Sequence, residues 1–155
     1  MDYKDLKNEL QDKLHGEILP TKTLDFRVYA IDAEVLSLSA PLDLNINDKG
    51  TAFGGSIASL CTITGWSMCW LIARQLDLEC DMVVYESNMS YSRPITKDFI
   101  AEVSFPNEDQ IQIIKAKMSE KNKAALELEV VINENEKECV KYTGKYAFIQ
   151  KKSNK

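Results

Sequence analysis

The sequence has one histidine, His15, and its four cysteines contain no C-x-x-C pair. Two of them, Cys61 and Cys69, lie inside the most apolar segment, which is typical of reduced, buried thiols. We therefore expect neither a disulfide framework nor a structural zinc site. His15 lies where an N-terminal helix is expected to end, so we expect it to interact with the terminal carbonyls of that helix. A Ser-His-Asp hydrolase is disfavoured.

The sequence also lacks an excess of positive charge, with 19 Lys and Arg against 24 Asp and Glu and a formal net charge of -5. An acidic surface is repelled by phosphate backbones, so nucleic acid is not expected as a partner. Residues 1–14 are charged and contain no apolar stretch of the kind found in secretory signals. We expect a cytoplasmic protein.

Low-complexity tracts and internal repeats are lacking, and 45% hydrophobic and 28% charged residues are the balance of a globular chain. Its 155 residues predict one domain, 1–155, that can bury a single core. Residues 50–73 carry no charge and are long enough to span a bilayer. Because this run is rich in Gly, Ser and Thr and its flanks are amphipathic, it predicts a helix buried inside a soluble domain, without a membrane partner.

Periodicity predicts the elements on both sides of that run. Residues 3–14 form an amphipathic helix with Leu6, Leu10 and Leu14 on one face, and Gly16 is placed to end it. This helix and Gly16 make up the N-terminal part, 1–16. Alternation of apolar residues then predicts strands at 26–31 and 36–40.

The uncharged helix is expected to run from about Gly54 to about Leu76, and after residue 81 the chain is strand-like. The expected strands are 83–91, 99–105, 110–118, 124–132 and 140–148, followed by a frayed basic tail, 150–155. In the first of them, one face is expected to hold Val83, Tyr85, Met89 and Tyr91. Short links favour antiparallel pairing. The fold class is α+β, with a long central helix wrapped by a curved antiparallel sheet.

The segment most suited to chemistry is the polar, glycine-rich loop 47–56, which leads into the buried helix. Backbone N–H groups at a helix N-terminus are unpaired and carry partial positive charge, so they can stabilise an oxyanion. An equally simple reading is that Gly54 and Gly55 only let the helix pack tightly. A phosphate-binding loop is disfavoured, because Gly55-Ser56 stands where such a loop has Gly-Lys-Ser.

At this loop the sequence resembles the hotdog superfamily, specifically thioesterase domains of the YiiD C-terminal type. The resemblance covers roughly residues 25–149. Three segments carry it: Asn47-x-x-Gly50-Thr51-x-Phe53-Gly54-Gly55, Thr62-x-Thr64-Gly65-Trp66 and Tyr91-x-Arg93-Pro94.

The resemblance implies a thioesterase that acts on an acyl-CoA or acyl-carrier-protein thioester, in a homodimer or dimer of dimers whose active sites lie between subunits. No cofactor and no metal is implied. The amides of Gly54 and Gly55 would hold the thioester carbonyl, and Asn47 would position the thioester or a water. Phe53, Tyr91 and Arg93 would complete the substrate site. Acetyltransferase activity, found in domains often fused to this type, is not expected.

One position departs from the family pattern, because many hotdog thioesterases have Asp or Glu where this chain has Thr62. A threonine hydroxyl can orient a water, but it is not a base near neutral pH. Glu86 is the first candidate for the missing base and Asp48 the second. If no base exists, the domain is a non-catalytic module that binds acyl thioesters or regulates through them, or a purely structural dimer. Cys61 and Cys69 lack a visible activating neighbour and are expected to pack in the core.

Overall fold

The elements of the fold are given by a computed structural model that describes residues 2–152; residues 153–155 of the expected frayed tail lie outside that range. The helices are α1 (Tyr3–Glu17), α2 (Leu19–Thr23), α3 (Gly54–Gln75) and α4 (Glu108–Lys121). The strands are β1 (Arg27–Ile31), β2 (Val35–Ala40), β3 (Cys80–Tyr91), β4 (Phe99–Ser104), β5 (Lys123–Glu134) and β6 (Lys137–Gln150).

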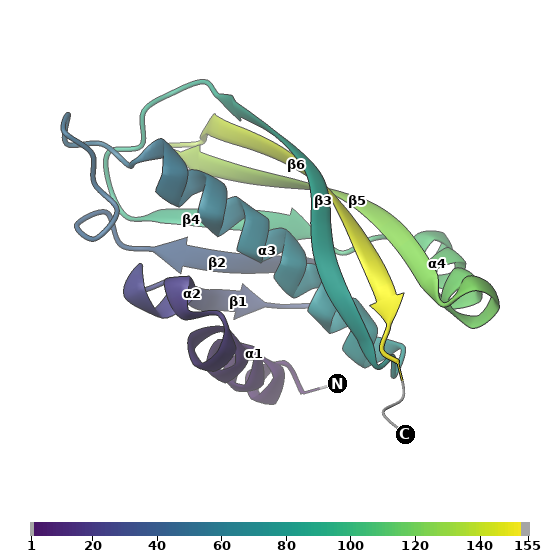
Figure 1. The fold of residues 1–155 in the computed structure, drawn as a ribbon. Coiled ribbons are helices and arrows are strands. Elements are labelled where there is room, and N and C mark those ends of the chain that lie inside the picture. Colours follow the sequence, from purple (N-terminus) through teal and green to yellow (C-terminus); the bar gives the residue numbers. More distant parts are fainter. Residues whose placement is uncertain (1, 153–155) are drawn as a thin grey trace.

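Within the described residues the strands form one six-stranded sheet in the order β1-β2-β4-β5-β6-β3. Every neighbouring pair is antiparallel. The sheet twists and curves around α3, which lies across its concave face and contacts strands β2 to β6 (Figure 1). The expected architecture, a long helix wrapped by a curved antiparallel sheet, is confirmed.

Helix α3 has no charged residue before Arg74 because almost all of it is core. Two of its buried hydroxyl groups are paired within the helix: Thr64 donates to the carbonyl of Leu60 and Ser67 to that of Ile63, each at 2.7 Å. By length and composition this helix could cross a membrane, and 78% of its most apolar stretch is buried inside the protein. The expected buried helix is therefore confirmed.

Residues 110–118 form most of α4, so the strand expected there was wrong. The helix begins with a capping box, in which the Asn107 side chain accepts from the Gln110 amide and the Gln110 side chain accepts from the Asn107 amide. Its buried residues recur at helical spacing and pack on the convex face of the sheet beside β5: Ile111, Ile114 and Met118.

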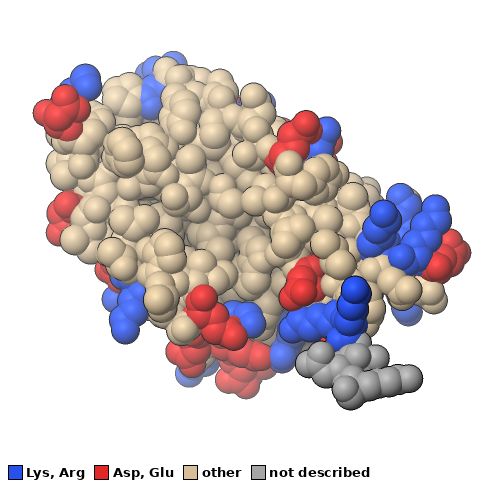
Figure 2. Space-filling view, viewed as in Figure 1, with Lys and Arg blue, Asp and Glu red and all other residues tan. Residues whose placement is uncertain are grey.

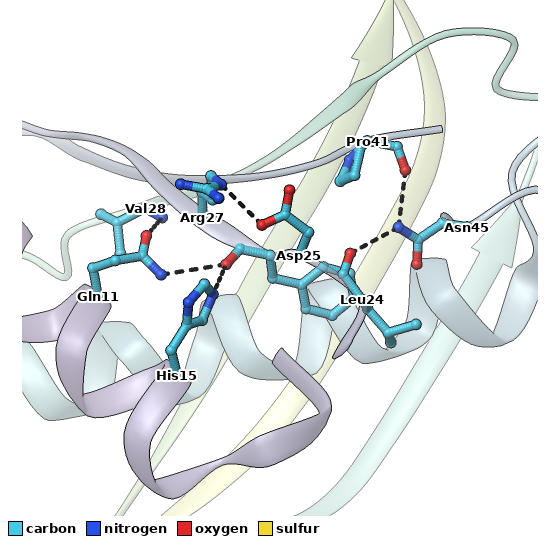
Figure 3. Close-up of polar contacts among 9 residues, drawn as sticks. Gln11, His15, Leu24, Asp25, Arg27, Val28, Pro41 and Asn45 are labelled. Atoms are coloured by element: carbon cyan, nitrogen blue, oxygen red, sulfur yellow. Dashed lines mark hydrogen bonds and ion pairs between the residues drawn. The ribbon is translucent and has the colours of Figure 1, made fainter. Parts of the chain in front are cut away.

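Helix α1 covers the β1 edge of the sheet with two side chains one turn apart (Figure 3). His15 Nε2 and Gln11 Nε2 both donate to the Phe26 carbonyl, at 2.7 and 3.3 Å, and the Val28 amide donates to Gln11 Oε1 at 2.7 Å. His15 thus bonds a carbonyl of the neighbouring chain segment. The expected bond to the terminal carbonyls of its own helix was therefore wrong. Gly16 does not end α1, which continues through it.

The opposite edge of the sheet, β3, is open and largely exposed. A bulge at Tyr85 divides it: Val83 and Tyr85 lie on the convex face, whereas Met89 and Tyr91, after the bulge, share the concave face with Tyr142 and Val140 of β6. The expected common face for these four β3 residues was therefore wrong. A long edge with exposed apolar side chains favours pairing with another strand.

The position of α3 on the sheet is fixed by a buried pair of tyrosines. Tyr146 Oη donates to the backbone carbonyl of Thr62 at 2.7 Å, and it lies 2.8 Å from Tyr142 Oη, which donates to it in turn. Burial raises the pKa of Tyr146, so this phenol stays protonated. Tyr146 packs directly against Gly65, where a Cβ would lie 2.6 Å from its Cζ.

We expect Gly65→Ala to lower the free energy of unfolding by about 2 kcal/mol, because neither the buried ring nor the helix can yield. For a chain of this size that corresponds to a Tm roughly 4–8 °C lower in thermal denaturation. Gly16→Ala is the matched control: a Cβ there meets nothing within 4 Å. It should raise stability by about 0.5–1 kcal/mol through helix propensity. An unchanged Tm for Gly65→Ala would contradict the tight packing.

Candidate active site

The loop before α3 is held by the side chain of Asn47. Its oxygen accepts from the amides of Lys49 and Thr51, at 2.8 and 3.1 Å, and its nitrogen donates to Thr51 Oγ1 and the Ala52 carbonyl, at 2.8 and 3.4 Å. These four bonds use the hydrogen-bonding capacity of the amide. Asn47 therefore positions the loop, and one of these bonds would have to break before it could contact a substrate.

Helix α3 begins with three free backbone donors. Phe53 is its N-cap residue and offers no side-chain cap. Among the described residues, no acceptor is bonded to the amides of Gly54, Gly55 or Ser56. Unpaired donors at the positive end of a 22-residue helix form a site for a negative oxygen. Gly54 and Gly55 leave them accessible from solvent, because Gly54 is half-buried and Gly55 exposed.

Two aromatic side chains border these amides. The Phe53 ring folds over Gly55, where a Cβ would lie 2.5 Å from its Cε2, yet the ring is 55% exposed and free to move. Tyr91 Oη donates to the Gly54 carbonyl at 3.1 Å. Burial and the nearby Cys61 raise the pKa of the Tyr91 phenol, which keeps it a hydrogen-bond donor. The structure thus brings Phe53, Gly54, Gly55 and Tyr91 together at the start of α3.

A partly exposed stripe continues along α3 from Gly55 through Ser59 and Thr62 to Trp66. Thr62 Oγ1 donates to the Ala58 carbonyl at 2.8 Å, so its hydroxyl hydrogen is used and its lone pairs are free to accept from a water. Ser59 Oγ donates to the Gly55 carbonyl at 2.9 Å. Ser59 was missed from the sequence, although its position one turn after Gly55 was a readable signal.

Gly55 and Thr62 cannot act on the same carbonyl within one chain. They are seven residues apart on a continuous helix, which places them about 10 Å apart along its axis. A reacting carbonyl has to lie about 3 Å from both its oxyanion donors and the group that orients its nucleophile. One chain therefore carries two parts of a site that do not meet.

The two candidate bases lie away from the α3 amides. Glu86 pairs with Lys145, whose neighbour Tyr146 points to α3, so Glu86 and Lys145 lie on the convex face of the sheet. A sheet extended by another strand would keep Glu86 on that face. Asp48 is exposed at the loop tip and lies 3.1 Å from Lys49 Nζ. The structure supports neither as a base within one chain.

The remaining expected residues have structural surroundings. Arg93 is exposed, and its amide donates to the Cys139 carbonyl at 3.3 Å. Burial raises the pKa of the Cys139 thiol, and the nearby Arg93 charge offsets only part of that rise. Cys61 is fully buried, and burial raises its pKa to about 12, so the thiol stays protonated and is a poor nucleophile. Among residues 2–152, no three His, Cys, Asp or Glu side chains are placed to share a metal ion.

The face that displays α3 carries few charged side chains at its centre (Figure 2). Charged groups gather at its rim, whereas the exposed stripe of α3 and the nearby part of β3 are apolar or neutral. Such a face suits an uncharged ligand or a second protein surface.

A long helix enclosed by one curved antiparallel sheet, with free amides at the helix N-terminus, defines a hotdog-fold protein. Residues 7–150 match the family model described as "Putative thioesterase (yiiD_Cterm)". The chain belongs to this family.

Solved structures agree with that assignment. A protein of unknown function from Chlorobaculum tepidum TLS is 28% identical, with a TM-score of 0.91 and 96% of each chain covered. A protein from Shewanella oneidensis described as a putative thioesterase is 30% identical, with a TM-score of 0.82, covering 94% of this chain and 99% of its own. A probable thioesterase from Pseudomonas aeruginosa, 16% identical with a TM-score of 0.78, covers 92% of this chain and 94% of its own and shares the fold.

Proposed function

We propose that the protein is a thioesterase that hydrolyses an acyl thioester of coenzyme A or of an acyl carrier protein, in a site completed by a second copy of the chain. The observation that carries the proposal is the set of unpaired amides at Gly54, Gly55 and Ser56, which open onto an uncharged face. The family to which the chain belongs supports the same activity.

In the proposed reaction a water attacks the thioester carbon, and the carbonyl oxygen becomes an oxyanion that accepts from the Gly54 and Gly55 amides. The carbon–sulfur bond then breaks. The acyl group leaves as a carboxylic acid, and the thiolate takes a proton to become the free thiol. Thr62 Oγ1 orients the attacking water by accepting its hydrogen bond, since its own hydrogen is held by Ala58.

The second copy is proposed from the geometry of α3 and β3. Gly55 and Thr62 are too far apart to serve one carbonyl, whereas a twofold axis can bring Thr62 of one copy to the amides of the other. The open β3 edge, with its exposed Val83 and Val84, supplies a surface for pairing. A homodimer, alone or within a dimer of dimers, follows from the proposal. Four buried, free cysteines favour a reducing compartment such as the cytoplasm.

A second candidate is an acyl-thioester-binding module without turnover. It is favoured by Thr62 in place of a carboxylate and by the position of Glu86 on the convex face. In this case the α3 amides would bind the thioester carbonyl in its ground state.

We expect the purified full chain to release thiol from a panel of acyl-CoAs of increasing chain length, measured with a thiol-reactive dye. Glu86→Gln should change kcat by less than about threefold, because Glu86 lies on the convex face, away from the α3 amides, and its exposed ion pair contributes only about 0–1 kcal/mol to stability. A loss near 10²-fold, the scale of general-base removal, would instead assign the base to Glu86. A rise in Tm with acyl-CoA but no turnover would favour the binding module.

A further inference from the structure

A pocket of about 500 Å³ lies on the convex face of the sheet and is lined by the second half of α4, by β5 and β6, and by Tyr85 of β3. Its floor is small and apolar, formed by Ala125, Ala147 and Ile149. Its volume falls in the range of small-molecule sites. The pocket lies on the opposite face of the sheet from α3 and from the candidate active site.

Three lysines line this pocket: Lys117 and Lys121, one turn apart on α4, and Lys123 at the start of β5. No carboxylate of residues 2–152 lies within 4 Å of their ammonium groups. Asp81 stands in the same cross-strand row as Lys123 but two strands away, about 10 Å. In a chain with a net charge of -5, this is a local concentration of unpaired positive charge.

The neighbouring surface carries charge of both signs. The next row of the convex face is Glu127, Lys145 and Glu86, in which Lys145 is already paired with Glu86. The three unpaired lysines around the pocket attract a compact polyanion.

Tyr85 lines the pocket from the β3 bulge and is 59% exposed. The bulge turns this ring to the convex face, beside the apolar floor. A flat aromatic wall, an apolar floor and several ammonium groups together match a ligand with an aromatic base and more than one phosphate.

We propose that this pocket binds the phosphorylated adenosine group of a nucleotide, with the phosphates held by Lys117, Lys121 and Lys123 and the base stacked on Tyr85. This chemistry has two sources, the 3′-phosphoadenosine end of coenzyme A and a free adenine nucleotide. The assignment to coenzyme A rests on the proposed thioesterase function, whereas binding of the nucleotide group does not.

The binding test uses adenosine 3′,5′-bisphosphate and isothermal titration calorimetry on the full chain. The triple variant Lys117→Ala, Lys121→Ala, Lys123→Ala should bind about tenfold or more weakly, from three charge contacts of modest strength. The matched control removes three exposed lysines outside the pocket, Lys4, Lys22 and Lys115, and should bind as the wild type does. Equal binding by both triple variants, or no binding by the wild-type chain, overturns the proposal.

Tyr85→Ala should also weaken binding of the bisphosphate, by about threefold to tenfold for one lost stacking contact. Tyr29→Ala is its control, because Tyr29 is similarly exposed, at 57%, but lies on β1. If Tyr85→Ala and Tyr29→Ala bind alike, the stacked base is refuted and the pocket is only a phosphate site.

Kinetics then separate the two sources. With acyl-CoA the lysine triple variant should raise KM about tenfold at unchanged kcat, while an acyl-N-acetylcysteamine thioester, which lacks the nucleotide, should be hydrolysed as by the wild type. Equal KM changes for both substrates, or a change only with an acyl carrier protein, overturn the coenzyme A assignment. ATP binding as tightly as the bisphosphate would assign the pocket to free nucleotides. Bisphosphate binding in a chain without turnover leaves this site standing and refutes the thioesterase.

Discussion

Gly55→Val is expected to lower kcat/KM for an acyl thioester by about 10²–10³-fold, the loss seen when oxyanion donors are removed. The valine methyl groups would occupy the space through which a carbonyl oxygen reaches the Gly54 and Gly55 amides. They would also displace the Phe53 ring, which a Cβ at Gly55 would meet at 2.5 Å. Because that ring is exposed and at the end of a flexible side chain, it can swing outward without disturbing the core.

The matched control is Gly16→Val. Gly16 is also an exposed helical glycine, a Cβ there meets nothing within 4 Å, and α1 lies away from the α3 amides. This variant should keep kcat/KM within about twofold, the size of an effect remote from the site. Circular dichroism and thermal denaturation establish that both variants fold. A folded Gly55→Val protein with normal turnover would refute the oxyanion assignment.

The core elements of the fold could be predicted because each depends on a pattern within its own stretch of sequence. The uncharged run predicted α3, since a helix without a polar face has to be buried, and alternating residues predicted β1, β2, β4, β5 and β6. The strand wrongly predicted at residues 110–118 arose because this segment fits both the two-residue period of a strand and the period of a helix. Ile111 and Ile113 alternate with glutamines as in a strand, yet Ile111, Ile114 and Met118 repeat as in a helix. The Asn107–Gln110 capping box was the signal that distinguishes them.

The loop–helix part of the site was also readable, because Gly54, Gly55 and Phe53 are adjacent in sequence. Its long-range parts were not. The contact of Tyr146 with Thr62, 84 residues apart, depends on how the sheet closes over α3. Because of the bulge at Tyr85, β3 residues of the same parity lie on opposite faces of the sheet before and after it. A strictly alternating pattern places them all on one face. The pocket beside Tyr85 depends on that bulge and on α4. Neither the bulge nor this helix was predicted from the sequence, so the pocket could not be predicted either.

Val84→Lys is expected to convert the proposed dimer to a monomer and to lower kcat/KM by at least about 10²-fold, because each site would lose the groups supplied by its partner. Val84 lies on the open β3 edge and, as the cross-strand neighbour of Tyr146, on the α3 side of the sheet. It is 40% exposed in the single chain, so a lysine there can remain solvated and the monomer should fold. In a dimer paired through β3, the lysine would be buried.

Burying an unpaired ammonium group costs several kcal/mol, which weakens association by roughly a thousandfold. Sedimentation velocity at micromolar concentration measures the change in mass, and circular dichroism checks the fold. Ile113→Lys is the matched control, because Ile113 is an exposed apolar residue on α4 and away from the β3 edge. It should leave mass and turnover unchanged. A Val84→Lys dimer with full activity would refute the pairing through β3. A wild-type chain that sediments as an active monomer would refute the composite site as well, since Gly55 and Thr62 would then have to act within one chain.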